Sequence, residues 1–159
     1  MSIILPSVQL DLQTRRRNQI KNRLDRVPVL YGERLSAEAY KKQYPSSEHR
    51  PVGPCATYNC HGLTFACRRA SIWEISEIQK ILLDDEYVQI ERKMVLTGDI
   101  AIYYSTDARE PEHSGWVVRI DPALGPIILS KWGKAHEVIH SVPNCPYDAG
   151  NVRFYRINT

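Results

Sequence analysis

The sequence predicts an α+β domain in which helices occupy the first half of the chain and an antiparallel sheet the second half. Before residue 85 apolar residues recur at helical spacing, whereas after it short runs rich in Val, Ile and Tyr are separated by Gly, Pro and Asp. A chain of 159 residues that is 43% hydrophobic can bury one core. We therefore expect a single domain over residues 1–159, with residues 1–45 as a helical N-terminal extension.

Two helices are expected in the first part of the chain. Residues 14–26 combine apolar residues at helical spacing with a basic cluster, which we interpret as the solvated face of a helix. Residues 36–44 form the second helix, with Ser36 as its N-cap, because a serine hydroxyl can accept a hydrogen bond from the first helical turn. The basic cluster consists of Arg15, Arg16, Arg17, Lys21, Arg23 and Arg26.

Two more helices are expected after a loop over residues 45–54, which is rich in Pro, Ser and Gly. The first covers residues 59–70, and the second covers residues 72–83. Ser71 and Glu74 have the spacing of a capping box, which indicates the start of the second of these helices.

The second half of the chain predicts an antiparallel sheet of about four to six short strands. The turn formers between residues 122 and 125 indicate a hairpin, so the strand that contains Ser130 should lie beside the strand that follows His113. The expected strands are residues 87–91, 99–104, 115–120, 126–131 and 152–156.

Charge and hydropathy exclude several classes of protein. The formal net charge of +3 is far below that of a dedicated nucleic-acid binder, so we expect no nucleic-acid partner. No run of about 18 apolar residues is present, so we expect no membrane span. Residues 1–13 lack the pattern of a signal peptide, so we expect the chain to be cytoplasmic as encoded; non-classical export would leave no trace in the sequence.

Cys60 is the strongest candidate nucleophile among the four cysteines. Without a signal peptide the cysteines are expected to be reduced. Cys60 stands where a Pro/Gly-rich loop enters a helix, and there free N–H groups and the helix dipole can lower the pKa of a thiol. The alternative is a small core residue, because free cysteine is often buried. Cys67 lies about two turns further along the expected helix and is predicted to be core.

His113 is the candidate general base. It stands at the expected start of a strand and is followed by Ser114 and Gly115, which would place an imidazole at the sheet edge with open space around it. The alternative is an exposed loop histidine. Ser130 can accept a hydrogen bond and is predicted to orient the His113 ring, whereas Lys131 would stabilise an oxyanion, bind a carboxylate or simply be a solvated surface lysine.

Three motifs resemble those of papain-like cysteine peptidases and amidases of the NlpC and CHAP type. Asn59-Cys60-His61-Gly62 resembles the nucleophile motif Asp-Cys-Ser-Gly, and Thr97-Gly98-Asp99 resembles the Pro-Gly-Asp stretch before a strand. His113-Ser114-Gly115 resembles the His-Val-Gly motif. The resemblance covers about half of the chain and implies a papain-like NlpC-type fold, with N-terminal helices packed on a C-terminal antiparallel sheet.

The resemblance implies a cysteine hydrolase that cleaves an amide bond, with a peptide or peptidoglycan-like substrate and no cofactor. Its setting would be that of a bacterial effector or toxin, for which a protein partner or inhibitor is also expected. The sequence departs from the family at His61, where Ser is usual, and at the third catalytic position, which has no obvious His, Asn or Glu. The expected catalytic residues are Cys60, His113 and Ser130. The expected substrate-binding residues are Tyr58, Asn59, His61, Lys131 and Trp132.

Three other functions remain open from the sequence. An acyltransferase of the same superfamily is one, because Asn59-Cys60 is similar to a pair in the lecithin retinol acyltransferase relatives, although there the histidine precedes the cysteine. A catalytically inactive papain-like binding or immunity module is another. The last is a metal-stabilised module, for which the spacing of the candidate ligands is poor. Those ligands would be Cys55, Cys60, His61 and Cys67.

Overall fold

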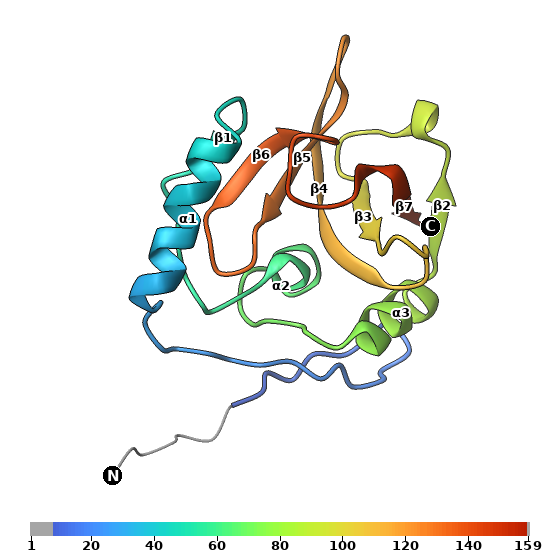
Figure 1. Ribbon diagram of the computed structural model, residues 1–159. Helices are drawn as coiled ribbons and strands as arrows, with labels where there is room; N and C mark the ends of the chain where they lie inside the picture. Colours follow the sequence, from blue (N-terminus) through green and yellow to red (C-terminus); the bar gives the residue numbers. More distant parts are fainter. Residues whose placement is uncertain (1–7, 159) are drawn as a thin grey trace.

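The computed structural model describes residues 8–158 and confirms the α+β class. Three α-helices and one seven-stranded antiparallel sheet are present in this part of the chain (Figure 1). None of its helices has the length and apolarity needed to cross a membrane. The elements, in chain order, are α1 (Tyr31–Gln43), β1 (Glu48–His49), α2 (Cys60–Phe65), α3 (Ile75–Asp84), β2 (Tyr87–Ile90), β3 (Ile100–Tyr104), β4 (Pro111–Asp121), β5 (Gly125–Lys131), β6 (Glu137–Ser141) and β7 (Val152–Ile157).

The sheet has the strand order β1-β6-β5-β4-β3-β7-β2, and every pair of neighbours is antiparallel. The predicted hairpin is confirmed, because β4 pairs with β5 and Gly115 lies opposite Ser130. Two strands were not predicted: β1, which falls within the expected loop, and β6. The final strand β7 lies between β3 and β2, so the sheet is not ordered as the chain is.

Both faces of the sheet are covered, and β3 shows this best because all five of its residues are buried. Its residues alternate between two hydrophobic clusters, as the two-residue period of a strand requires. Tyr103 lies in the cluster that includes Ala37 of α1, whereas Ile102 lies in the cluster that includes Ile78 of α3. Helix α2 contacts β4 and β5 near the centre of the sheet (Figure 1).

The helix predicted over residues 14–26 is wrong. This segment is extended and forms isolated bridges, among them the pair of Arg23 with Ser71. The Thr14 hydroxyl and the Asn18 amide both donate to the Asp84 carboxylate at 2.7 Å. These tertiary contacts outweigh the helical propensity of the segment, as tertiary context often does. Within the described residues the N-terminal extension is therefore helical only in α1.

The helix starts also differ from the prediction. Helix α1 begins at Tyr31, so Ser36 is an interior residue whose hydroxyl donates to the Gly32 carbonyl at 3.1 Å. Helix α3 begins at Ile75 after Glu74, and no side chain caps it. Ser71 does not form the predicted capping box, because its backbone pairs with Arg23 instead.

Helix α2 is a short helix of six residues and ends well before residue 70. The chain turns there through Cys67 and Arg68, which have φ angles of 49° and 63°. This left-handed pair ends the helix and turns Cys67 outward. Cys67 is therefore exposed, and its predicted place in the core is wrong.

Candidate active site

Cys60 is the first residue of α2, as predicted, and Asn59 fixes this helix start. The side-chain oxygen Oδ1 of Asn59 accepts hydrogen bonds from the backbone N–H of Gly62 at 2.9 Å and of Ile72 at 3.1 Å. Its amide donates to the Ile72 carbonyl at 2.7 Å. Asn59 is 2% exposed and caps the helix while tying it to the segment before α3. Asn59 positions Cys60. Because its side chain is buried, it is not available for the predicted contact with a substrate.

The environment of Cys60 differs from the one that the sequence suggested. Cys60 is buried, and burial raises the pKa of its thiol to about 11. The backbone N–H groups of Ser114 and His61 and the positive charge of Lys131 lower this pKa, but they do not outweigh the desolvation. Cys60 is therefore a neutral thiol at pH 7 in this conformation, rather than the low-pKa thiol expected at a helix start.

His113 is an interior residue of the central strand β4, not a residue with open space around it. Its side chain is fully buried and stacks on the Tyr147 ring with centroids 3.6 Å apart and planes 7° apart. Neither of its ring nitrogens has a hydrogen-bond partner among the described residues. Burial and two nearby histidines hold the pKa of His113 well below its usual value, so the ring is neutral. A buried imidazole without partners is unusual and requires an explanation.

Strand β4 places the backbone of His113 near Cys60, but no hydrogen bond links the two side chains among the described residues. The peptide N–H between His113 and Ser114 lies close enough to the Cys60 sulfur to lower its pKa. Successive residues of a strand face opposite sides, so the Ser114 hydroxyl contacts His61 of α2 at 2.8 Å while the His113 ring contacts Tyr147. No hydrogen bond joins Cys60 to His113 among residues 8–158.

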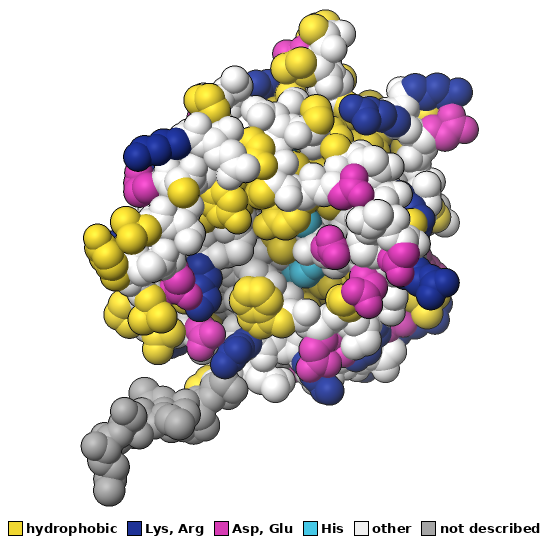
Figure 2. All heavy atoms as spheres, in the orientation of Figure 1, with side chains coloured by type: hydrophobic (Ala, Val, Ile, Leu, Met, Phe, Trp, Pro, Cys, Tyr) yellow, Lys and Arg dark blue, Asp and Glu magenta, His cyan; other side chains and the backbone are white. Residues whose placement is uncertain are grey.

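Tyr147 is a site residue that the sequence analysis did not select. It is partly exposed, covers one face of the His113 ring, and has its pKa raised by burial and by the nearby Cys60. Figure 2 shows a few histidine atoms recessed in the middle of one face, among hydrophobic and acidic side chains. The signal in the sequence was the Cys145-Pro146-Tyr147 stretch, but its contact with β4 is a tertiary contact that local patterns do not reveal.

Ser130 does not orient His113, and this prediction is wrong. The Ser130 hydroxyl is fully buried and bonds to the Nε2 atom of His140 at 2.8 Å, and it accepts a hydrogen bond from the Trp132 indole at 3.1 Å. The predicted pairing of β4 with β5 is correct, but β6 supplies His140 on the other side of β5. Because β6 was not predicted, the sequence did not indicate that His140 would be the partner of Ser130.

Lys131 is buried rather than a surface lysine. Its ammonium donates to the carbonyls of Cys55 at 2.9 Å and of Gly133 at 2.7 Å, and it lies 5.0 Å from the centre of the Tyr58 ring. No carboxylate lies within ion-pair distance of Lys131 among the described residues. Burial lowers the pKa of Lys131, while the nearby Cys55 and Cys60 raise it.

The remaining predicted substrate-binding residues are also buried. Tyr58 donates to the Glu137 carboxylate at 2.6 Å, and the Arg68 guanidinium donates to the same carboxylate at 3.2 Å. Trp132 is 1% exposed and packs against the rings of Tyr40 and other aromatic residues. His61, like these residues, therefore supports the structure around Cys60 and does not present a free binding surface.

No metal centre is formed by the residues that the structure describes, since they contain no group of three or more His, Cys, Asp or Glu side chains arranged to hold an ion. Comparison of the chain with family models, curated proteins and solved structures found no match. Any functional conclusion must therefore come from the geometry of the site.

Proposed function

We propose that the protein is a cysteine hydrolase of papain-like NlpC type that cleaves an amide bond in a peptide or peptidoglycan-like substrate. One observation carries the proposal. The sulfur of Cys60, at the start of α2, lies beside the peptide of His113, whose buried ring has two unpaired nitrogens. A thiol at a helix start and an imidazole that is free to accept a proton are the two groups that acyl transfer requires.

The chemistry begins with a neutral thiol and a neutral imidazole. His113 removes the Cys60 proton as the sulfur attacks the substrate carbonyl carbon, and the carbonyl oxygen becomes an oxyanion. The C–N bond then breaks, and His113 returns the proton to the leaving amine. Water, deprotonated by His113, hydrolyses the thioester and restores the free thiol. The neutral state of both groups favours this general-base route over a preformed thiolate–imidazolium pair.

Lys131 supplies the positive charge in this mechanism. A buried ammonium without a carboxylate partner is costly, and two carbonyl contacts leave it one free N–H. Its charge already favours the thiolate of Cys60. We assign Lys131 to stabilise the negative charge that develops on the sulfur and the substrate oxygen.

Substrate access requires movement of Tyr147. Cys60 is 6% exposed, and Tyr147 covers the His113 ring. Displacement of Tyr147 would uncover the face of the His113 imidazole on which it stacks.

A second function is favoured by the same burial. A papain-like module without activity would retain Cys60 and His113 as core residues, and the absence of a hydrogen bond between them agrees with that role. The two functions differ in one measurable property, which is whether Cys60 forms a covalent acyl intermediate.

The test is acylation by p-nitrophenyl acetate, followed by mass spectrometry of the intact protein and its peptides. Exposed Cys67 would react first with a general thiol reagent, so the reactions use the Cys67→Ala protein. We expect acetylation of Cys60, its loss in Cys60→Ala, and a rate at least tenfold lower in His113→Gln.

One control protein completes the experiment. Cys55→Ala removes a partly buried thiol nearby and should leave acetylation of Cys60 unchanged. If Cys60 is not acetylated in folded protein, or if His113→Gln acetylates at the rate of the parent protein, the hydrolase is excluded and the inactive module remains.

A further inference from the structure

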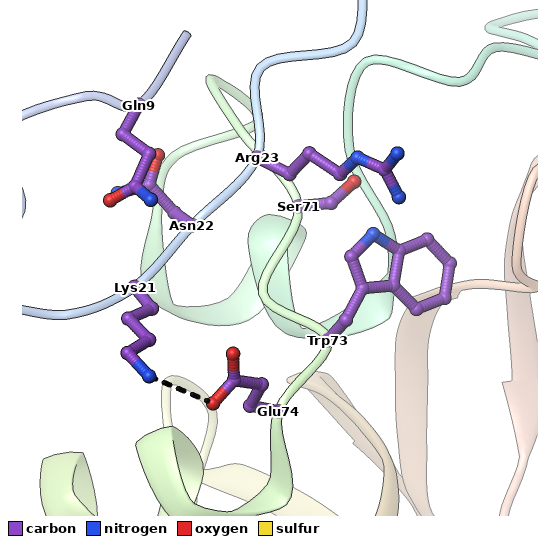
Figure 3. A pocket seen from close by; sticks show the side chains of 7 residues that line it. All are labelled: Gln9, Lys21, Asn22, Arg23, Ser71, Trp73 and Glu74. Atoms are coloured by element: carbon purple, nitrogen blue, oxygen red, sulfur yellow. Dashed lines mark ion pairs between the residues drawn. The ribbon is translucent and has the colours of Figure 1, made fainter. Parts of the chain in front are cut away.

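We propose that a pocket between the N-terminal segment and the segment before α3 binds the C-terminal carboxylate of a peptide that ends in an apolar residue. The pocket has a volume of about 290 Å³, and Figure 3 shows the side chains that line it. It involves neither Cys60 nor His113, and the proposal does not depend on activity there. The pocket is lined by Gln9, Lys21, Asn22, Arg23, Ser71, Trp73 and Glu74.

The first argument is an unpaired hydroxyl. Ser71 is 1% exposed, and its Oγ atom has no hydrogen-bond partner among residues 8–158. Leaving a buried hydroxyl unpaired is unfavourable, so the Ser71 hydroxyl requires an explanation, and a bound ligand would supply the missing partner. Figure 3 shows the Ser71 hydroxyl on the side of the Arg23 guanidinium and the Trp73 indole.

The second argument is that hydrogen-bond donors line the pocket with the serine. The only ion pair of Arg23 among the described residues is a 3.5 Å contact from Nε to Asp25. A guanidinium has five N–H donors, so most of those of Arg23 remain available, and a terminal pair can hold both oxygens of a carboxylate. The indole N–H of Trp73, which also lines the pocket, is a further donor.

The charge of the pocket selects a ligand with one negative charge. Lys21 forms a 3.6 Å ion pair with Glu74, so these two residues largely neutralise each other. The Glu74 carboxylate would repel a dianion such as a phosphate monoester more strongly than a single carboxylate. Trp73 is 51% exposed, and its indole face can pack against an apolar side chain next to that carboxylate.

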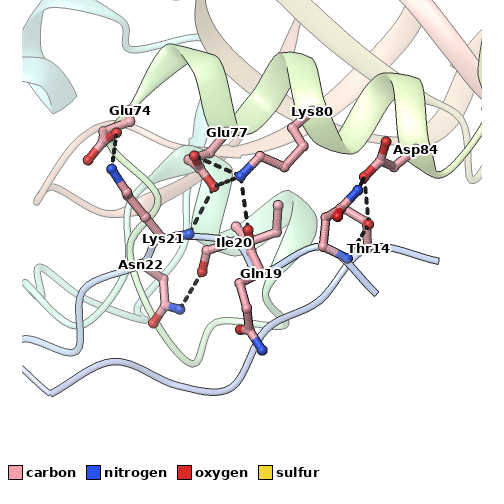
Figure 4. Close-up of polar contacts among 10 residues, drawn as sticks. Thr14, Gln19, Ile20, Lys21, Asn22, Glu74, Glu77, Lys80 and Asp84 are labelled. Carbon is pink, nitrogen blue, oxygen red and sulfur yellow. Dashed lines mark hydrogen bonds and ion pairs between the residues drawn. The ribbon is translucent and has the colours of Figure 1, made fainter. Parts of the chain in front are cut away.

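The walls of the pocket are held in place before any ligand arrives. Arg23 and Ser71 exchange two backbone hydrogen bonds of 2.8 Å. The Lys21 backbone N–H donates to the Glu77 carboxylate at 2.9 Å, and the Asn22 amide donates to the Ile20 carbonyl at 3.0 Å (Figure 4). Because the backbone is already ordered, binding would cost little conformational entropy.

The experiment is isothermal titration calorimetry of the full chain with N-acetyl-glycyl-phenylalanine and with the C-terminal amide of the same peptide. We expect saturable binding of the acid and at least tenfold weaker binding of the amide, because the amide lacks the charge that Arg23 pairs with. Arg23→Gln should weaken binding of the acid at least tenfold, since it removes the charged hydrogen bonds that hold the carboxylate.

Ser71→Ala is the decisive variant. Removing an unpaired buried hydroxyl should not lower the melting temperature. It should nevertheless weaken binding of the acid peptide about fivefold, because one hydrogen-bond donor is lost. Arg16→Gln, an exposed arginine on the same segment outside the pocket, is the matched control and should leave affinity unchanged.

Four outcomes would overturn the proposal. They are no binding of the acid, equal binding of acid and amide, unchanged affinity in Ser71→Ala, and displacement of the acid by inorganic phosphate at lower concentration. The measurement reports binding alone, so a failed acylation test at Cys60 leaves its result intact.

Discussion

Substitution of Gly62 by alanine should destabilise the protein strongly, because the start of α2 has no room for a Cβ atom. A Cβ at this position would lie 3.0 Å from the Tyr58 Cβ atom and 3.0 Å from the Ala70 carbonyl carbon, and closer still to the Ala70 carbonyl oxygen. Most of these atoms are backbone, which cannot rotate away as the end of a long side chain can. The helix that carries Cys60 or the segment at Ala70 must move.

The magnitude follows from the severity of this overlap. Overpacking of a core usually costs about 1 to 3 kcal/mol, and a contact with fixed backbone belongs at or above the upper end. With an m-value of about 2 kcal/mol per molar urea, a loss of about 3 kcal/mol lowers the unfolding midpoint by about 1.5 M. The measurement is urea unfolding followed by circular dichroism, with the midpoint compared between Gly62→Ala and the parent protein.

Gly32 provides the matched control. It lies inside α1, and a Cβ atom there would meet nothing within 4 Å. Gly32→Ala should raise the free energy of unfolding by about 0.5 to 1 kcal/mol, because alanine loses less backbone entropy than glycine in a helix. The packing argument would be refuted if the urea midpoint of Gly62→Ala lay within 0.5 M of the parent midpoint, because a shift of about 1.5 M is expected.

Three further predictions concern buried polar groups and the covering tyrosine. Burial lowers the pKa of His61 to about 4 and of His140 to about 4, below the usual 6.5. Below pH 6.5 the unfolded chain therefore binds more protons at these two residues than the folded chain does, and the folded state loses stability as the pH falls. Together the two histidines should lower the free energy of unfolding by about 3 kcal/mol between pH 7 and pH 5. An unchanged melting temperature over that range would contradict this. Ser130→Ala should lower the free energy of unfolding by about 1 to 3 kcal/mol, because His140 loses a buried partner, but should leave the rate of Cys60 acetylation unchanged; a slower rate would restore Ser130 to the site. Tyr147→Ala should speed acetylation of Cys60 by p-nitrophenyl acetate, and an equal or lower rate in folded protein would show that Tyr147 does not control access.

The sequence predicted the elements whose signals are local. Short runs rich in Ile and Tyr identified the strands Ile100–Tyr104 and Gly125–Lys131, and the short connection after Asp121 identified β4 as the hairpin partner of β5. The position of Cys60 at a helix start was also predicted correctly, because a Pro/Gly-rich loop followed by helical spacing is a local pattern.

The errors come from partners that are distant in the chain. Strand β6 was not predicted; it buries the polar side chains of Glu137 and His140, whose hydrogen-bond partners Arg68 and Ser130 lie elsewhere in the chain. The pKa of Cys60 was misjudged for a related reason. A helix start lowers the pKa of a thiol, but the depth of its burial is a tertiary property that no local pattern contains.

The position of β7 has a consequence for biosynthesis. Of the seven strands β7 is made last, yet it occupies the place between β3 and β2 in the sheet. Until it leaves the ribosome, β2 has no partner and β3 shows an open edge to other chains. The loop with Tyr147 directly precedes this strand, so the ring that covers His113 is also among the last parts to be placed. A nascent chain therefore exposes the edge of β3 to other chains until β7 is available to pair with it.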